Sequence, residues 1–368
     1  MPASSPAAAS ASLSRLSAPH VAVVGATGAV GEEFLRVLAQ RNFPIGKLTL
    51  LASARSAGKE LRFRDQKIVC EELTEQSFRG VDLALFSAGG SISKKLGPAA
   101  VDAGAVVVDN SSAFRMTPGV PLVVPEVNPE AITQANIGLG ADHTPGIIAN
   151  PNCSTIIMLM AVTPLHRAVA VKRMVVSTYQ AASGAGAAAM RELEQQTREA
   201  LDPANRGEVK TKDIFPFQYA FNLFSHNSPM QPNGYNQEEL KMVYETHKIW
   251  AQNPEDDNAT KITATCIRVP VMRAHAESIN LTFAGTMTEP QARELIAAAP
   301  GVDLIDDRDN NRFPMPLDAT HRDDCYVGRI RRDLSQPEGV GLDLFVCGDQ
   351  VRKGAALNAV QIAELLVR

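Results

Sequence analysis

The feature that most constrains the fold is a short apolar run at residues 21–24, followed at once by a glycine-rich turn and a helical stretch at 32–40. The turn reads Gly-Ala-Thr-Gly-Ala-Val-Gly over residues 25–31. An uninterrupted apolar run of this length is typical of a strand buried on both faces, as in parallel sheets. Glycines directly after such a strand allow a tight turn into a helix. The sequence therefore predicts a strand–turn–helix unit at the start of a parallel sheet.

Further strand candidates follow at regular intervals, and most of them end in loops of Gly, Ser, Asn or Arg. They lie at residues 47–52, 67–71, 81–86 and 105–109. Strands that alternate with helical stretches are the pattern of a doubly wound α/β sheet. In such a sheet the ligand-binding loops lie at the carboxyl ends of the strands. We therefore expect a binding crevice where these loops meet.

The pattern changes near residue 150. An apolar helix is predicted from 153 to about 162, and strands at 173–179 and 261–268 are separated by longer loops. Residues 202–235 are rich in Pro, Asn and Phe and show no period, so they form either a cover over the site or a subunit contact. At 352–368 the spacing of apolar residues predicts an amphipathic helix.

These changes divide the chain into a first α/β domain and a second α+β domain with a mixed sheet, to which catalysis and dimerisation are assigned. The first domain comprises residues 19–152 and 350–368, the second comprises 153–349, and residues 1–18 form a tail. The tail is rich in Ala and Ser and has one Arg and no acid, which is typical of a targeting remnant or a disordered tail. A cytoplasmic or plastid location is compatible with it.

Composition excludes several classes of function. The 368 residues suit two domains, and the net charge is −4 with the basic residues scattered, which disfavours a nucleic-acid partner. No apolar run approaches the length of about 20 residues that spans a membrane. The five cysteines show no CxxC spacing and no His cluster, so we expect reduced thiols and no metal site.

The glycine-rich turn predicts a dinucleotide site, because glycines let the backbone approach a pyrophosphate at the helix N-terminus. Its spacing is GxxGxxG, which is less specific than GxGxxG. The second strand ends with Ser53, Arg55 and Ser56 in place of the acid that NAD sites use. An arginine there accommodates a 2′-phosphate and favours NADP(H), although Arg55 could also be a solvated loop residue. The predicted cofactor contacts are Gly25, Thr27, Gly28, Ala29, Val30, Gly31, Ser53, Arg55, Ser56 and Ser87.

Cys153 is the candidate nucleophile. It follows Pro151 and Asn152, and Ser154 opens the predicted helix. A thiol at a helix N-terminus is expected to have a lowered pKa, and the same N–H groups or the Asn152 amide could stabilise an oxyanion. The alternative, which is retained for the other four cysteines, is a buried inert thiol.

Three motifs together carry a resemblance to a known family. They are Asn-Pro-Asn-Cys-Ser-Thr at 150–155, the turn at 25–31, and Ile-Arg-Val-Pro-Val-Met-Arg-Ala-His at 267–275. With them the sequence from about residue 21 to its end resembles the aspartate-semialdehyde dehydrogenases. The resemblance implies a Rossmann-like first domain and NADPH-dependent reduction of L-aspartyl 4-phosphate to L-aspartate 4-semialdehyde and phosphate, on the route to lysine, threonine, methionine and isoleucine. It also implies a homodimer or homotetramer.

The resemblance assigns roles residue by residue. Cys153 carries a thioester, His275 is the general acid and base, and Gln180 orients the substrate. The remaining assignments are Arg268 for the substrate carboxylate, Glu238 for its ammonium, Arg115, Lys241 and Asn152 for phosphate, and Ser183, Gly184 and Gln350 for the cofactor.

Several of these residues have simpler interpretations. Arg115 could be solvated, and Glu238 with Lys241 could be an ordinary helical ion pair. Glu239 completes a capping box with Asn236 and is interpreted as a helix cap, not a ligand. Arg268 and His275 are seven residues apart, which on one straight strand would place them on opposite faces. If both line one pocket, the chain has to leave the strand near Pro270.

Three other functions were weighed. A related acyl-phosphate reductase acting on another substrate, such as N-acetylglutamyl phosphate, is the nearest alternative. A thiol-dependent acyl hydrolase or transferase would leave the glycine turn and Arg55 unexplained. A non-enzymatic NADP-binding sensor would leave the cations Arg268, Lys241 and Arg115 without a role.

Overall fold

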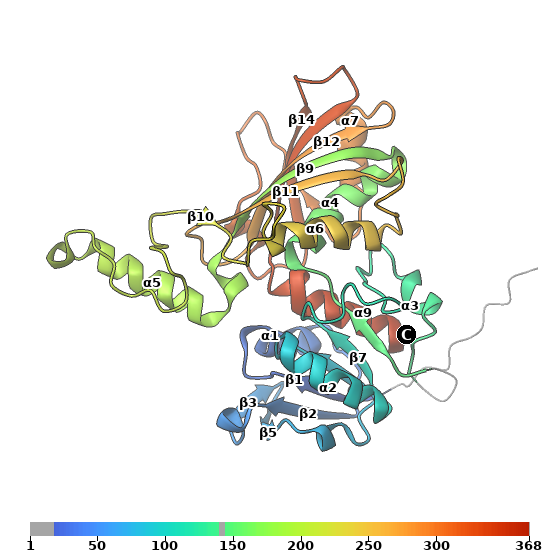
Figure 1. The fold of residues 1–368 in the computed structure, drawn as a ribbon, viewed down its shortest axis with the longest axis vertical. Helices are drawn as coiled ribbons and strands as arrows, with labels where there is room; N and C mark the ends of the chain where they lie inside the picture. The colour runs from blue at the N-terminus through green and yellow to red at the C-terminus, as the bar shows by residue number, and fades with distance from the viewer. Residues whose placement is uncertain (1–17, 140–143, 368) are drawn as a thin grey trace, which may run out of the picture.

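The computed structural model describes residues 18–139 and 144–367. Its strands build a parallel six-stranded sheet in the order β5-β2-β1-β6-β7-β8, a mixed seven-stranded sheet in the order β10-β11-β9-β12-β15-β14-β13, and a β3-β4 hairpin (Figure 1). The predicted combination of a doubly wound parallel sheet and a mixed-sheet domain is confirmed.

The strands are β1 (His20–Val24), β2 (Lys47–Ala52), β3 (Glu60–Phe63), β4 (Gln66–Val69), β5 (Glu71–Glu72), β6 (Leu83–Phe86), β7 (Val106–Asp109), β8 (Ile147–Ala149), β9 (Val171–Gln180), β10 (Phe224–Ser225), β11 (Lys261–Arg268), β12 (His275–Phe283), β13 (Val302–Leu304), β14 (Cys325–Arg332) and β15 (Gly341–Gly348). The helices are α1 (Ala29–Gln40), α2 (Gly90–Asp102), α3 (Glu130–Gln134), α4 (Cys153–Ala168), α5 (Ala187–Leu201), α6 (Gln237–Ile249), α7 (Glu289–Ala297), α8 (Pro316–Ala319) and α9 (Leu357–Val367).

The parallel sheet is apolar on both faces. Along β1, Val21 and Val23 belong to a core with α1 and α9, whereas Ala22 and Val24 belong to a second core on the opposite face. Because side chains alternate across a strand, covering both faces requires the continuous apolar run seen in the sequence. The sheet therefore presents its strand ends, and not its faces, to ligands.

Two predicted elements differ in the structure. The strand expected at 67–71 is divided: β4 pairs with β3 in the hairpin, and only the two-residue β5 joins the parallel sheet at its edge beside β2. The helix expected to end near residue 162 continues to Ala168, with Pro164 inside it. Burial of ten consecutive helical residues from Ser154 to Thr163 in the core explains why the proline does not end the helix.

The C-terminal helix was wrongly expected to be amphipathic. It begins as a π-helical turn, Arg352–Ala356, and continues as α9, in which no described residue is exposed. Figure 1 shows α9 between the parallel sheet and the mixed sheet, and it contributes Val360, Ile362 and Leu366 to the core of the parallel sheet. A helix covered on every side needs no polar face.

The mixed sheet holds three strands in a register that matters for the site. β9 pairs in parallel with β11, so that Gln180 lies opposite Arg268. On its other side β9 pairs antiparallel with β12, with Tyr179 opposite Ala276. His275 therefore lies beside Gln180, and the three polar side chains form one row across the sheet.

The prediction for residues 1–18 falls almost wholly on residues 1–17, which lie outside the described residues, so the compartment stays a prediction. In the described parts of the chain, no helix is long and apolar enough to cross a membrane. All five cysteines are free thiols.

Candidate active site

A cavity of 400 Å³ lies where loops of the parallel sheet meet the row on the mixed sheet. Cys153, Gln180 and Arg268 line it, together with Glu238 and Lys241 of α6. It also receives Arg115 and Asn152, so the predicted nucleophile, substrate and phosphate residues are brought together, with the exception of His275.

Cys153 is the first residue of α4. The N-cap Asn152 accepts hydrogen bonds through Oδ1 from the backbone N–H groups of Ser154 (3.0 Å) and Thr155 (3.2 Å). This cap explains why the helix begins at the cysteine. Asn152 was also expected to offer its amide to phosphate, but Nδ2 donates to Glu238 at 2.8 Å. Its role as a phosphate ligand stays a prediction.

The expectation of a lowered thiol pKa is wrong for this structure. Burial raises the pKa of Cys153 to about 12, and the Glu238 carboxylate adds to the increase. The cations Arg115, Arg268 and Lys241 oppose this change without reversing it. Desolvation of the thiolate thus outweighs the attraction of the surrounding positive charge, and the resting cysteine is a thiol.

Gly354 packs directly against the cysteine. A Cβ atom at this position would lie 2.7 Å from Cβ of Cys153 and 3.2 Å from its Cα. We predict that Gly354→Ala displaces the sulfur and lowers kcat by about a hundredfold, because misplacing a reacting group by about 1 Å costs this much. Steady-state kinetics check the prediction. Gly90→Ala is the matched control, since a Cβ there meets no atom within 4 Å; equal rates in both variants would contradict it.

His275 lies behind the cavity wall. Its side chain is fully buried, and a Cβ on the cavity residue Gly184 would lie 3.0 Å from His275 Nε2 and 3.1 Å from Arg268 Nη1. His275 Nδ1 accepts a hydrogen bond from the backbone N–H of Ala181 at 3.0 Å. Nε2 therefore carries the proton of the neutral ring, and it has no protein partner. Burial, and next the charge of Arg268, lowers the pKa of His275 well below its ordinary value.

The chain does leave the strand between Arg268 and His275, as expected. β11 ends at Arg268, β12 begins at His275, and residues 269–274 form the connection. Val269 still donates to Gln180 O at 3.1 Å, and Ala182 donates to Val271 O at 2.8 Å. This connection lets residues of odd spacing share one face.

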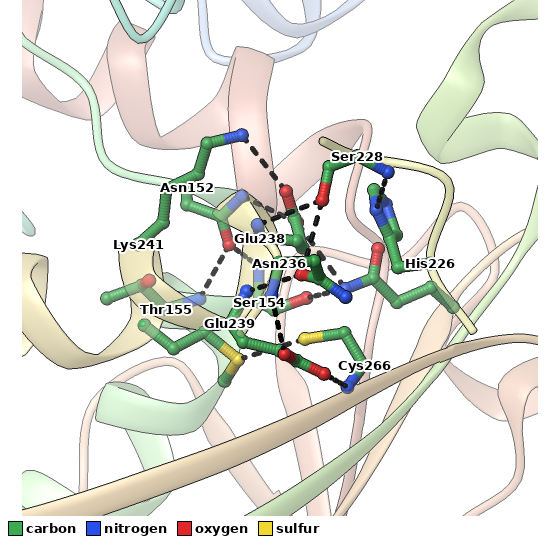
Figure 2. Close-up of polar contacts among 12 residues, drawn as sticks. Asn152, Ser154, Thr155, His226, Ser228, Asn236, Glu238, Glu239, Lys241 and Cys266 are labelled. Carbon is green, nitrogen blue, oxygen red and sulfur yellow. Dashed lines mark hydrogen bonds and ion pairs between the residues drawn. The ribbon is translucent and has the colours of Figure 1, made fainter. Parts of the chain in front are cut away.

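Glu238 is the centre of the polar network in Figure 2. Its Oε1 accepts from Asn152 and, at 3.4 Å, from Gln180 Nε2, while its Oε2 accepts from Lys241 Nζ at 3.0 Å. Burial by itself would raise the pKa of Glu238, but Lys241, His226 and Asn152 together hold it well below its ordinary value. The ion pair with Lys241 thus exists, and it lines the cavity.

Glu239 caps its helix, as predicted. The Asn236 side chain accepts from Glu239 N at 3.0 Å, and Glu239 Oε2 accepts from Asn236 N at 2.9 Å. Glu239 Oε1 also accepts from the backbone N–H of Cys266, which ties α6 to β11 (Figure 2). Neighbouring glutamates of one helix therefore differ in role because only Glu238 faces the cavity.

Arg115 is buried and not solvated. Its guanidinium donates to the backbone oxygens of Asn150 and Asn110, each at 2.9 Å, and to Glu245 Oε1 at 3.0 Å. Glu245 Oε2 accepts in turn from Asn152 N at 2.6 Å. These bonds hold the arginine at the cavity wall, while its role as a phosphate ligand stays a prediction.

A second cavity, of 640 Å³, lies at the carboxyl ends of β1, β2 and β6. It is lined by Gly25, Thr27, Gly28 and Ser53, and it shares Ser87 with the first cavity. Gly25 has φ +82°, and a Cβ on it would lie 2.6 Å from Ser87 O. A Cβ on Gly31 would lie 2.2 Å from Gly25 O. The close approach of backbone and the free N-terminus of α1 fit the pyrophosphate of a dinucleotide.

The other cofactor residues are placed differently. Arg55 is exposed on the short 3₁₀ turn Ala54–Ser56 and does not line this cavity, and Ser56 is buried. Ala29 starts α1, while Val30 faces the first cavity. Gln350 joins the two parts of the site, since it donates to Ser183 and accepts from Ala274 N at 3.0 Å.

The sequence prediction missed one cavity residue with a titratable side chain. His226, treated as structural in the sequence, lines the first cavity and lies 2.8 Å from Arg268. It belongs to residues 202–235, which have no periodicity, so no sequence signal marked it. The same segment, close to the projecting α5 in Figure 1, also exposes Phe217, Phe221 and Met230. In the described residues, no group of His, Cys, Asp or Glu side chains could hold a metal ion.

The comparisons with known proteins agree with this architecture. The family described as "Semialdehyde dehydrogenase, NAD binding domain" matches residues 20–135, and "Semialdehyde dehydrogenase, dimerisation domain" matches residues 162–353. Fold, cavity and family thus define an oxidoreductase with a nicotinamide-dinucleotide-binding domain and a dimerisation domain.

Individual relatives narrow the assignment. The aspartate-semialdehyde dehydrogenase of Synechocystis is 56% identical over 348 residues, which cover 95% of this chain and 97% of that protein. The crystal structure of aspartate semialdehyde dehydrogenase II complexed with ASA from Vibrio cholerae matches with a TM-score of 0.87 at 44% identity, covering 95% of this chain and 98% of that one. A structure with NADP from Candida albicans matches with a TM-score of 0.71 at 25% identity, covering 95% and 98%. The chain belongs to the aspartate-semialdehyde dehydrogenase family.

Proposed function

We propose that this protein reduces L-aspartyl 4-phosphate with NADPH to L-aspartate 4-semialdehyde and phosphate, through a thioester on Cys153. The observation that carries the proposal is the position of Cys153. It lies on one cavity wall with Gln180, Arg268 and Lys241, and that cavity shares Ser87 with the cavity at the dinucleotide turn. A thioester formed there lies within reach of a cofactor bound across both cavities.

The charges of the cavity support an amino-acid substrate. Arg268 offers a guanidinium for a carboxylate. Glu238 stays ionised and offers a partner for an ammonium group. N-acetylglutamyl phosphate carries an uncharged amide in place of the ammonium, so the buried Glu238 carboxylate favours the aspartyl substrate over this alternative.

The thiol step follows from the raised pKa of Cys153. The sulfur attacks the acyl carbon, the bond from that carbon to the phosphate oxygen breaks, and the thiol proton leaves with the phosphate. A thioester remains. Arg115 and Lys241 would balance the charge of the departing phosphate, and Gln180, whose Nε2 donates to Ser154 Oγ at 3.1 Å, would hold the acyl group near the helix N-terminus.

The reduction step needs a hydride, which the nicotinamide supplies when it is bound. His275 holds a proton on Nε2, and donation of this proton to the carbonyl oxygen neutralises the charge that develops there. Collapse of the thiohemiacetal then releases the aldehyde and returns the thiol. The proton that His275 gives up is replaced from solvent.

We propose that residues 19–152 with 350–368 bind the cofactor and that residues 153–349 form the catalytic and dimerisation domain. A homodimer or homotetramer is proposed, and the exposed apolar residues Phe217, Phe221 and Leu223 support a subunit contact by this segment. The first and third functional alternatives, a hydrolase and a sensor, do not use the dinucleotide and thiol together.

The test is a steady-state assay of purified protein with aspartate semialdehyde, phosphate and either NADP or NAD. We expect reduction of NADP that requires phosphate. N-acetylglutamate semialdehyde in the same assay tests the alternative substrate. Phosphate-independent reduction, or preference for the N-acetylated aldehyde, would refute the proposed function.

The preference for NADP is predicted to depend on Arg55, which lies at the end of β2 beside the cavity residue Ser53. Arg55→Ala should raise the KM for NADP by about tenfold, because a charge-assisted hydrogen bond to the 2′-phosphate is lost, and it should leave the KM for NAD unchanged. The exposed Arg62 on β3 provides the control variant Arg62→Ala. A KM for NADP that is the same in the wild type and both variants would show that Arg55 is a solvated loop residue.

A further inference from the structure

The strongest unassigned feature is the imidazole of His226, which follows β10 and reaches the cavity. Its backbone N–H donates to Cys266 O at 2.9 Å, which anchors this stretch to β11. Its Nδ1 accepts from the backbone N–H of Ser228 at 3.1 Å (Figure 2). A backbone amide can only donate, so Nδ1 holds the lone pair and Nε2 holds the proton of the neutral ring.

The ring remains neutral in this environment. Burial lowers the pKa of His226 to about 4, and although Glu238 opposes the change, Arg268 and Lys241 add to it. At neutral pH the imidazole therefore has one proton, and the bond from Ser228 places that proton on Nε2.

Nε2 of His226 lies 2.8 Å from Nη2 of Arg268. A guanidinium has only donors, so in this tautomer two N–H groups stand side by side with no acceptor between them. The other bonds of the guanidinium go to Ala181 O at 3.1 Å and Asn227 Oδ1 at 3.4 Å. Among residues 18–139 and 144–367, no carboxylate forms an ion pair with Arg268. The arrangement lacks an anion.

A carboxylate is the anion that fits two adjacent donors. Its two oxygens accept in parallel from paired N–H groups, as they do from an arginine fork. The positive charge comes from Arg268, and the neutral histidine adds a directed donor without adding charge. On the other side of the guanidinium, Gly184 separates Arg268 Nη1 from the proton-bearing Nε2 of His275, so the carboxylate end and the reacting end of a substrate have separate donors.

We propose that His226 is a substrate-binding residue, whose Nε2–H acts together with Arg268 to hold the α-carboxylate of the substrate. This inference rests on the proposed function, since it assumes a substrate with an α-carboxylate. It assigns to His226 a part in specificity: aldehydes without the carboxylate leave both donors unpaired in a partly buried site, which is costly.

Two substitutions separate the donor from the rest of the ring. His226→Asn retains an acceptor for Ser228 at the Nδ1 position and removes the donor at Nε2. His226→Gln retains a donor near the Nε2 position. We expect His226→Asn to raise the KM for aspartate semialdehyde by tenfold to a hundredfold, which is about the worth of a hydrogen bond to a charged group, with a smaller effect on kcat. His226→Gln should recover most of this loss.

The substrate supplies the second arm of the test. 3-Aminopropanal is aspartate semialdehyde without its carboxylate, and it is compared by kcat/KM and as a competitive inhibitor of the semialdehyde reaction. If His226 binds the carboxylate, wild type and His226→Asn have the same inhibition constant for 3-aminopropanal. A loss that is equal for both compounds would mean a structural role and would overturn the inference.

Two further outcomes are informative. An increase in the KM for phosphate with an unchanged KM for aspartate semialdehyde would place His226 at the phosphate and would also overturn the inference. Thermal unfolding of both variants shows whether they fold. If the wild type itself fails to reduce NADP with aspartate semialdehyde, the proposed function fails, whereas an active wild type with no difference between the variants refutes only the role of His226.

Discussion

Replacing Cys153 by alanine is expected to abolish the phosphate-dependent reduction of NADP by aspartate semialdehyde, with a loss of kcat of about four orders of magnitude or more. The reason is that no other cysteine can take over: Cys70, Cys266, Cys325 and Cys347 are all buried, and none lines the cavity. The measurement is the initial rate of NADPH formation with purified variant. A rate within tenfold of the wild type would exclude the thioester route.

The reactivity of the same thiol gives an independent readout. Because burial raises its pKa to about 12, the thiolate fraction at pH 8 is very small and increases about tenfold with each pH unit. The rate of alkylation of Cys153 by iodoacetamide should therefore still be increasing between pH 8 and pH 10 in the ligand-free enzyme. A plateau near pH 7 would contradict the raised pKa. Cys153→Ala provides the background rate.

The second large effect concerns stability and comes from Glu277 on β12. Both carboxylate oxygens of this fully buried side chain lack a hydrogen-bond partner in the protein. Burial, together with the charge of Glu238, raises its pKa well above the ordinary value of 4.5. The side chain is thus protonated in the folded protein at pH 7 and ionised in the unfolded chain.

This difference destabilises the wild type as the pH rises. The unfolded chain releases the proton above pH 4.5, whereas the folded protein retains it, so each further pH unit costs about 1.4 kcal/mol until the folded pKa is reached. Glu277→Gln resembles the protonated acid and does not titrate. We predict that it raises the free energy of unfolding by about 3 kcal/mol at pH 7 and that the gain disappears near pH 4.

Denaturant unfolding at pH 4, 5, 6 and 7 checks the sign. The matched control is Glu33→Gln, at a buried carboxylate that is paired with Arg273 and Arg352. Although burial opposes it, these arginines lower the pKa of Glu33, so its stabilisation is present above its unfolded pKa and is lost as the pH falls through the folded pKa. Glu33→Gln should destabilise at pH 7. Destabilisation of similar size by Glu277→Gln would disprove the protonated state.

The sequence placed the cofactor site more accurately than the substrate site. The turn at 25–31 encodes its own geometry, because Gly25 and Gly31 are required by backbone contacts within a few residues of chain and by the neighbouring strand end. The helix cap formed by Asn236 and Glu239 was also predictable, since both partners belong to one helical turn. Local patterns of this kind depend on few distant contacts.

The contacts of the substrate site depend on tertiary structure. Only the sheet register places Arg268 beside Gln180, and only the α4–α6 contact brings Asn152 to Glu238. His226 had no local signal because its role depends on a strand that begins 35 residues later. The pKa of Cys153 was misjudged for the same reason: a helix N-terminus is visible in the sequence, but the burial that dominates the thiol is not.

By itself the amino-acid order determined the strand–turn–helix units, the parallel sheet, the nucleophile candidate and the family resemblance, because these depend on apolar periodicity and short-range motifs. The tertiary structure alone decided that the last helix is buried on all sides, that His275 lies behind Gly184, and which protonation states the buried groups adopt. Solvent exclusion and the pairing of charges are properties of the assembled fold, since they require groups from segments far apart in the chain to be brought into contact.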